Sequence, residues 1–235
     1  MYFDLSTLGE GIAYKLMTAT VTPRPIAWVV SQDATGGINA APFSFFNLLG
    51  DKPPTLVLGL TSKADGRLKH TARNILETRD FVVNLVPASL LDAMNLTAID
   101  APDGISELSL AGLTPAASSQ IAPPRIAESP VAFECRLAHS IETGPGQYAL
   151  IATILAMHIE DSVILDAARG HIDAPALDLI ARSFGAEYLR PGERLQRDRP
   201  TWRAFQAAAA SPLSENHAKD EQSAVTAVAK VNHGS

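Results

Sequence analysis

Apolar and polar positions along the chain fall into short runs that mostly predict β-strands. The first run is a compact set of β-branched and aromatic residues from Ile26 to Val30, followed by a turn signal at 33–37 and a renewed apolar pattern from Ile38. Two such runs around a glycine-containing turn are typical of a β-hairpin. The second arm is unusual because small side chains at 39–41 precede Pro42, which cannot donate to a sheet ladder. We expect this backbone to admit a flat ligand at close range.

Four later runs also predict strands. They are Thr55–Leu60, which we expect to be buried on both faces, Phe81–Val86, and the pair Val131–Glu142 and Tyr148–Glu160 around the turn at 144–146. Because the strands outnumber the helices and arrive mostly as hairpins, the pattern favours an antiparallel barrel with peripheral helices over a parallel doubly wound sheet. We therefore predict a mainly β protein.

Helical spacing is confined to short stretches. The clearest is 69–78, where Ala72, Ile75 and Leu76 fall on one side of an amphipathic helix. A short turn of helix or strand is expected within residues 1–22. Further short helices are predicted at 90–96, 105–110 and 175–182.

One domain accounts for most of the 235 residues. From about residue 200 the composition changes to Ala, Ser, Glu and Lys, with one aromatic pair at Trp202 and Phe205. We therefore predict a domain at 1–199 and a C-terminal extension at 200–235 that is helical or disordered, with a disordered tail after about Ser211.

Composition excludes several classes of function. The net charge of −6 and the pI of about 5.5 argue against a nucleic-acid partner, because such proteins need a basic face. The single cysteine, Cys135, fits a reducing compartment and is expected to be a buried, inert thiol within a strand. No apolar run approaches the roughly 18 residues that span a bilayer, and the histidines lack a compact metal-ligand spacing. We expect a cytoplasmic protein without a metal, membrane or nucleic-acid partner.

A group of cations interrupts this acidic chain just before the clearest predicted helix. Lys63, Arg67 and Lys69 lie close together, Ser62 precedes them, and Thr71 stands in the first helical turn. Unpaired amides and the dipole at a helix start attract anions, so the segment predicts a phosphate site. The alternative is a solvated surface loop in which Thr71 is an ordinary helix cap.

The hairpin stretch resembles the opening signature of the flavin reductase-like FMN-binding proteins and reads TVTPRPIAWVVSQDATGGINAAPFSFFN. Later pieces follow in the family's order: PPTLVLGL at 53–60, KHTARNILETRDFVVNLV at 69–86, VAFECRLAHSIET at 131–143 and LIARSFGAEYL at 179–189. The resemblance covers residues from about 12 to 190. It implies an antiparallel split β-barrel that binds FMN and forms a homodimer with the flavin at the subunit interface.

The resemblance also implies which residues contact the cofactor. The cationic loop would hold the FMN phosphate, and the amides of 39–41 and 43–45 would face the isoalloxazine ring, although at least two of Phe43, Phe45 and Phe46 are expected to pack in the core. Arg24 would stand near the N1 edge of the ring, hold the dimer interface, or form an exposed salt bridge. The candidate FMN contacts are Arg24, Asn39, Ala40, Ala41, Pro42, Phe43, Ser44, Phe45, Ser62, Lys63, Arg67, Lys69, Thr71 and Arg182.

The implied activity is transfer of a hydride from NADH or NADPH to bound FMN, serving a partner monooxygenase. No acid or base constellation is needed, because stacking of the two rings governs this reaction. One departure is that reductases of the family commonly carry Gly-Asp-His where this chain has Pro145-Gly146-Gln147. Two alternatives therefore stay open: a flavoredoxin-like electron carrier that holds FMN tightly, and a flavin-free split-barrel domain used for assembly. FMN is favoured over FAD.

Overall fold

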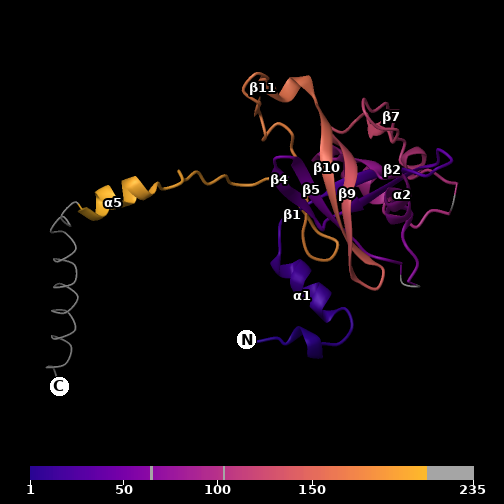
Figure 1. Cartoon of the computed structure of the whole chain (residues 1–235), viewed down its shortest axis with the longest axis horizontal. Helices are drawn as coiled ribbons and strands as arrows, with labels where there is room; N and C mark the ends of the chain where they lie inside the picture. The colour runs from indigo at the N-terminus through magenta and orange to yellow at the C-terminus, as the bar shows by residue number, and fades with distance from the viewer. Residues whose placement is uncertain (64–65, 103, 211–235) are drawn as a thin grey trace. The chain divides into compact units, whose positions relative to one another are not determined.

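The computed structural model describes residues 1–63, 66–102 and 104–210, and of 207–210 only the backbone. The chain divides into two units, Met1–Gly192 and Glu193–Ser235. The first unit contains the sheets, and the second contains helix α5 (Trp202–Ala210) (Figure 1). The rings of Trp202 and Phe205 stack in this helix. The extension was predicted to be helical or disordered. The boundary at 199/200 stays a prediction, and the tail predicted after Ser211 lies outside the described residues.

Within the described residues, seven antiparallel strands form the main sheet in the order β3-β2-β6-β9-β10-β5-β4. Their bounds are β2 (Ala27–Gln32), β3 (Ile38–Phe43), β4 (Phe46–Asp51), β5 (Pro54–Leu60), β6 (Asp80–Asn84), β9 (Val131–Gly144) and β10 (Gln147–Ile159). Strand β3 lies at one edge and pairs with β2, so that Ala40 faces Val30. The long β9–β10 hairpin lies in the middle of the sheet (Figure 1).

Shorter elements surround this sheet. The remaining strands are β1 (Arg24–Pro25), β7 (Pro115–Ala116), β8 (Arg125–Ile126), β11 (Ile164–Asp166), β12 (His171–Ile172), β13 (Ala181–Arg182) and β14 (Tyr188–Leu189). The helices are η1 (Leu5–Thr7), α1 (Ile12–Thr20), α2 (His70–Thr78), η2 (Ala88–Leu90), α3 (Leu91–Leu96), α4 (Glu107–Leu110) and η3 (Asp161–Val163). No helix among the described residues is long and apolar enough to cross a membrane.

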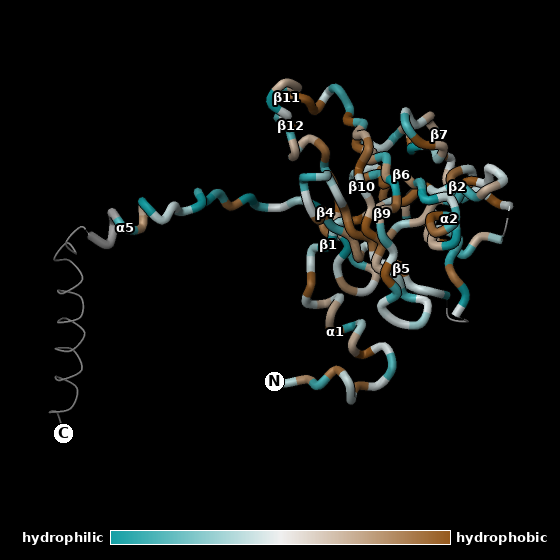
Figure 2. Tube along the Cα trace, in the orientation of Figure 1, coloured by the Kyte–Doolittle hydropathy of each residue, from teal (hydrophilic) through white to brown (hydrophobic). Residues whose placement is uncertain are grey.

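Alternation of side chains along β2, β6 and β9 builds a core on each face of the sheet. Val29 and Phe81 belong to one cluster together with the leucines of β5, whereas Trp28 and Val82 belong to the other. The second cluster is covered by the segment at 88–126. Hydrophobic residues accordingly concentrate along the central strands in Figure 2. The segment at 88–126 is thereby fixed over the β3–β2–β6 part of the sheet.

The mainly β, antiparallel architecture confirms the sequence prediction, as do the hairpin, the long β9–β10 pair and helix α2. Strand β4 was missed because most of its residues are exposed and give no burial pattern. Burial of β5 on both faces was wrong, since buried and half-buried residues alternate along it. Phe43 and Phe46 pack with the first cluster, as expected for two of the three phenylalanines.

The helix predicted at 175–182 is wrong. The segment instead forms a turn, a bridge from Leu179 to Pro87, and strand β13. The amide of Ile180 donates to the carbonyl of Val86, and Asp178 has a φ of 45° that no α-helix accommodates. Residues 179–180 therefore pair in an extended conformation with residues 86–87, which follow β6, and this pairing overrides the local preference for a helix.

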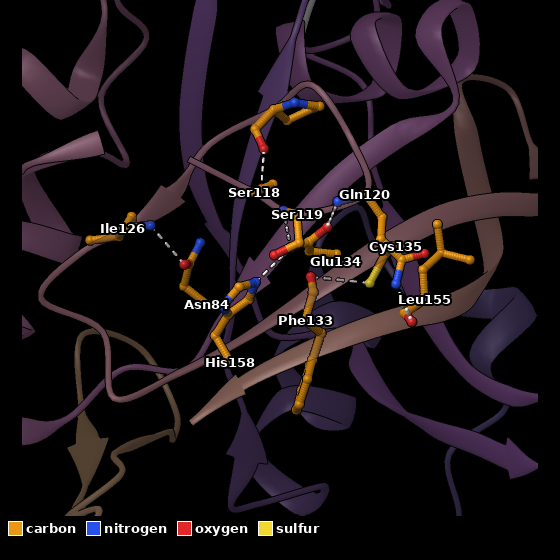
Figure 3. Close-up of polar contacts among 11 residues, drawn as sticks. Asn84, Ser118, Ser119, Gln120, Ile126, Phe133, Glu134, Cys135, Leu155 and His158 are labelled. Carbon is orange, nitrogen blue, oxygen red and sulfur yellow. Dashed lines mark hydrogen bonds and ion pairs between the residues drawn. The ribbon is translucent and has the colours of Figure 1, made fainter. Parts of the chain in front are cut away.

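A buried carboxylate network anchors the β7–β8 connection to the centre of the sheet (Figure 3). Glu134 is fully buried in β9, and the amides of Ser119 and Gln120 donate to its two oxygens at 2.6 and 2.7 Å. Nε2 of His158 lies 2.6 Å from Oε1 of Glu134. On the opposite face, burial raises the pKa of the Cys135 thiol, which is buried as predicted.

Burial alone would raise the pKa of Glu134, but the hydrogen bonds from His158, Ser119 and Gln120 outweigh it and hold the pKa below the ordinary value of 4.5. A lowered folded-state pKa contributes stability above the unfolded-state pKa, and this contribution is lost as the pH falls. Glu134→Gln should lower the free energy of unfolding at neutral pH by about 3 kcal/mol, because it breaks a buried pair. It should also flatten the loss of stability between about pH 5 and pH 3 in urea titrations.

Asp80→Asn is the matched control for Glu134→Gln, because Asp80 of β6 pairs with Arg136 of β9, the strand that carries Glu134, while half of the Arg136 side chain is exposed. Its cost should be under about 1 kcal/mol. If the two variants lose the same unfolding free energy, or if Glu134→Gln and the natural chain lose stability in parallel as the pH falls, the role assigned to Glu134 is contradicted.

The tip of the β9–β10 hairpin packs against the cationic loop. Gly146 has a φ of 67°, and a Cβ there would lie 2.8 Å from Cβ of Ser62. Gly146→Ala should therefore combine backbone strain with a clash and cost about 2 to 3 kcal/mol of unfolding free energy. Gly112→Ala is the control, since Gly112 has a φ of 66° with open surroundings, and should cost only about 1 kcal/mol. Urea denaturation that gives the same loss for both would show that the contact is unimportant.

Candidate functional site

The hairpin arm and the cationic loop meet at one cavity. It has a volume of about 130 Å³ and lies between edge strand β3, the start of α2 and the segment that connects α3 to α4. We call it the lysine cavity. It is lined by Asn39, Ala41, Pro42, Phe43, Lys63, Lys69, His70, Thr71, Ala98, Ile99, Asp100, Ala101 and Glu107.

A hydrogen bond joins strand β3 to helix α2. Nδ2 of Asn39 donates to Oγ1 of Thr71 at 2.8 Å, and both residues are almost fully buried. Because side chains alternate along a strand, Asn39 and Ala41 line the cavity while Ala40 packs into the second core cluster. Thr71 is the second residue of α2 and does not cap it, because the N-cap is Lys69. The capping alternative for Thr71 is therefore wrong.

Strand β3 is the edge of the sheet, yet its outward amide at Ala40 is paired. Oε2 of Glu107 in α4 accepts a hydrogen bond from that amide at 3.0 Å, and Glu107 is only 3% exposed. Two positions later Pro42 has no amide hydrogen to offer. Of the amides expected to face a ligand, the one of Ala40 is thus occupied by Glu107.

Positive charge at the cavity comes from the loop before α2 and from its start. The amide of Lys63 donates to the carbonyl of Arg67 at 2.8 Å, and Lys63 lines the cavity. Nζ of Lys63 lies 3.7 Å from Oδ1 of the exposed Asp100. Lys69 and His70 add to the wall where the first amides of α2 lack partners within the helix. The site therefore combines two lysines with a helix N-terminus.

A second cavity shares Pro42, Phe43 and Ala98 with the first and has a volume of about 260 Å³. We call it the arginine cavity, because the guanidinium of Arg182 lies on its wall, 4.6 Å from the centre of the Tyr188 ring. Seven of its ten lining residues are apolar or aromatic, and the others are Ser44, Asn95 and Arg182. The lining residues are Tyr14, Ile26, Pro42, Phe43, Ser44, Met94, Asn95, Ala98, Arg182 and Tyr188.

Arg24 lies outside both cavities and is 6% exposed, which excludes the exposed salt bridge considered from the sequence. Its guanidinium donates to the carbonyls of Thr18, Val21 and Ser183 at 2.6 to 2.8 Å, and its Nε lies 3.4 Å from Oγ of Ser44. These acceptors belong to α1, the residue after it, the bend between β3 and β4, and the β13–β14 connection. Arg24 therefore fixes segments around the arginine cavity instead of lining it.

Four other candidates from the sequence lie away from the two cavities. Ala40 is in the core, Phe45 is exposed and faces the ring of Tyr14, and Ser62 packs against the hairpin tip. Arg67 contributes its carbonyl to the loop turn. The remaining nine candidates line one or both cavities.

Sequence reasoning missed the contribution of the segment at 88–126. Ala98, Ile99, Asp100, Ala101 and Glu107 all line the lysine cavity, although only short helices at 90–96 and 105–110 had been predicted in this segment. A glutamate in the stretch SELSLAG carries no signal of its burial or of its distant partner. Among the described residues, no group of three His, Cys, Asp or Glu side chains is arranged to hold a metal ion.

Comparison with known proteins places this chain in a family. The sequence pattern of the flavin reductase like domain matches residues 18–174. An uncharacterized protein of Deinococcus radiodurans is 39% identical over 188 residues, which is 78% of this chain and 82% of that protein.

Solved structures agree with this match. Nitrilotriacetate monooxygenase component B from Bacillus cereus has 33% identity and a TM-score of 0.80, covering 84% of this chain and 98% of that one. The 2-nitrobenzoate 2-nitroreductase of Pseudomonas fluorescens has 32% identity and a TM-score of 0.77, covering 86% and 98%. Flavoredoxin of Desulfovibrio vulgaris, at 22% identity and a TM-score of 0.66 over 84% and 97%, shares the fold. The chain belongs to the flavin reductase-like family and has its split-barrel fold.

Proposed function

We propose that the protein binds FMN across the lysine and arginine cavities and acts as an NAD(P)H-dependent flavin oxidoreductase. The observation that carries this proposal is that residues of β3 and residues at or just before the start of α2 line the same cavity, namely Asn39, Ala41 and Pro42 on the one hand and Lys63, Lys69 and Thr71 on the other. These segments are far apart in sequence and are joined by the Asn39–Thr71 hydrogen bond.

The lysine cavity has the chemistry of a phosphate site. Lys63 and Lys69 bring positive charge into a chain whose net charge is −6, and the first amides of α2 point an array of donors toward an anion. Asn39 and Thr71 keep the wall between β3 and α2 in place. These residues fit the phosphate end of FMN.

The ring of FMN would extend over Pro42 and Phe43 into the arginine cavity. Neither cavity reaches the roughly 300 Å³ at the lower end of ligand sites, so a whole flavin requires both and the surface around them. The apolar lining there offers a flat surface, with Ser44 and Arg182 as polar groups for the ring edge. FMN is favoured over FAD, because the cations converge on one small cavity.

Bound FMN would supply the redox chemistry by accepting a hydride from NADH or NADPH. The residues of this chain would hold the flavin ring in position. Pro42 and Phe43 would support the ring, and Arg24 fixes the segments around the arginine cavity. Catalysis of this type depends on holding two rings together and needs no side-chain acid or base. The names of the two relatives of known activity, a monooxygenase component and a nitroreductase, support a reductive role and a partner monooxygenase.

A homodimer is also proposed. Leu48 and Leu49 of strand β4 and Tyr14, Met17 and Phe45 are exposed apolar side chains, and patches of this kind mark interaction sites. Tyr14 itself lines the arginine cavity, so a partner covering these residues would enclose the ring. The mass of the protein in solution tests this proposal. The cytoplasmic location stays a prediction.

The alternative function is a flavoredoxin-like carrier that exchanges electrons with a protein partner. It is favoured by Gln147, which stands where reductases of the family commonly have histidine. Gln147 begins β10 and is exposed at the hairpin tip next to Gly146, which packs on Ser62. The tip therefore lies beside the cationic loop, where a missing histidine would affect the approach of a nucleotide.

Loss of a phosphate contact should weaken FMN binding. Lys69→Ala and Thr71→Ala are each expected to cost about 1 to 3 kcal/mol of binding free energy, because a charge-assisted or hydroxyl contact is removed. Isothermal titration with FMN measures this loss. Lys52→Ala is the control, since Lys52 is exposed in the turn between β4 and β5. Unchanged affinity in both site variants would move the phosphate elsewhere.

Anaerobic mixing with pyridine nucleotides separates the two functions. The FMN-loaded protein should lose its visible flavin absorbance on addition of NADH or NADPH, because the proposed site stacks the two rings. A flavin that stays yellow for many minutes with both nucleotides rules out the oxidoreductase. If FMN then survives dialysis and a protein donor reduces it, the carrier is the correct function.

A further inference from the structure

The lysine cavity contains a buried negative charge that a phosphate site does not require. Glu107 is 3% exposed, and it lines the same cavity as Lys63 and Lys69. A carboxylate close to a bound phosphate repels it, so its presence opposes the affinity that the lysines provide. Some other interaction must offset this cost if the site binds a phosphorylated ligand.

The contact with Ala40 does not by itself explain a carboxylate. Oε2 of Glu107 accepts one hydrogen bond from the Ala40 amide, and a neutral glutamine could accept the same bond. A carboxylate has two oxygens with about four lone-pair sites and donates no hydrogen bond. Glu107 therefore keeps acceptor capacity on a group that lines the cavity.

The fold holds this acceptor in a fixed position. Leu108, the next residue of α4, is 2% exposed in the second core cluster, and the Ala40 hydrogen bond fixes the head of the Glu107 side chain against β3. Lys69 and the start of α2 supply positive charge and hydrogen-bond donors to the same cavity. A matching ligand needs an anionic group for the cations and hydrogen-bond donors near it for Glu107.

We propose that Glu107 accepts hydrogen bonds from the hydroxyl groups of the flavin's ribityl chain and so selects a ligand that carries both a polyol and a phosphate. This inference rests on the proposed binding of FMN, and it assigns Glu107 a role in specificity. The hydroxyl-bearing chain lies between ring and phosphate in FMN. Ala41, Pro42 and Glu107 line the same cavity as the two lysines.

The test compares two ligands on matched variants. One ligand is FMN, and the other is an FMN analogue whose N10 chain keeps the terminal phosphate but lacks the hydroxyl groups. Glu107→Leu should weaken FMN about 10-fold or more, the effect of losing hydrogen bonds to a charged group, and should change the affinity for the analogue far less. Glu107→Gln, which keeps an acceptor for the Ala40 amide, should give a smaller loss that is again confined to FMN.

Asp100→Asn is the control for charge alone, because Asp100 lines the same cavity but its side chain is 77% exposed. It should shift the affinities for FMN and the analogue by the same factor. Thermal unfolding of each variant checks that it is folded. If Glu107→Leu does not fold, the comparison rests on Glu107→Gln, where an absence of ligand-selective loss overturns the proposal.

Other outcomes are equally decisive. Equal losses for both ligands would reduce Glu107 to a residue that shapes β3, and unchanged FMN affinity would remove it from the site. A natural chain that binds FMN and the analogue equally well would overturn this inference while leaving FMN binding intact. A natural chain that binds neither would overturn the proposed function itself.

Discussion

Strand β3 is an edge strand, and its outward backbone groups would pair with another chain unless something occupied them. Glu107 takes the amide of Ala40, and Pro42 has none to offer. The edge is thereby turned into the wall of a cavity. The segment at 88–126 must lie over this part of the sheet for Glu107 to arrive there, and the second core cluster keeps it in place. The arrangement of the site follows from this closure.

The same strand determines how charge is distributed. The side chain of Asn39 donates a hydrogen bond to Thr71, so the start of α2, together with Lys69 at its N-cap, lies against β3. In an acidic chain this brings two lysines, the start of a helix and a buried carboxylate to one small cavity. Such a pattern suits a ligand with two chemically different parts and disfavours a bare anion, because the carboxylate repels it.

Local signals in the sequence were sufficient for the hairpin, helix α2 and the cationic loop, because turn residues and apolar spacing act over a few residues. They were insufficient for Glu107, whose partner Ala40 is 67 positions away. The helix predicted at 175–182 failed for a related reason, since Ile180 pairs with Val86 across the fold. Strand β4 has exposed side chains, so no burial pattern marked it. Long-range pairing, not local preference, decided these elements.

Arg24 was singled out from the sequence as a cofactor contact, but the structure gives it a different role. Its position between two prolines indicated a rigid cation, and the structure uses that rigidity to hold carbonyls from α1 and the β13–β14 connection. Strand β1 pairs with β13 so that Arg24 faces Arg182 across the ladder. The guanidinium of Arg24 thus fixes the strand that carries the cation of the arginine cavity. Because a buried guanidinium with several acceptors is costly to replace, the geometry of that cavity depends on a residue that does not line it.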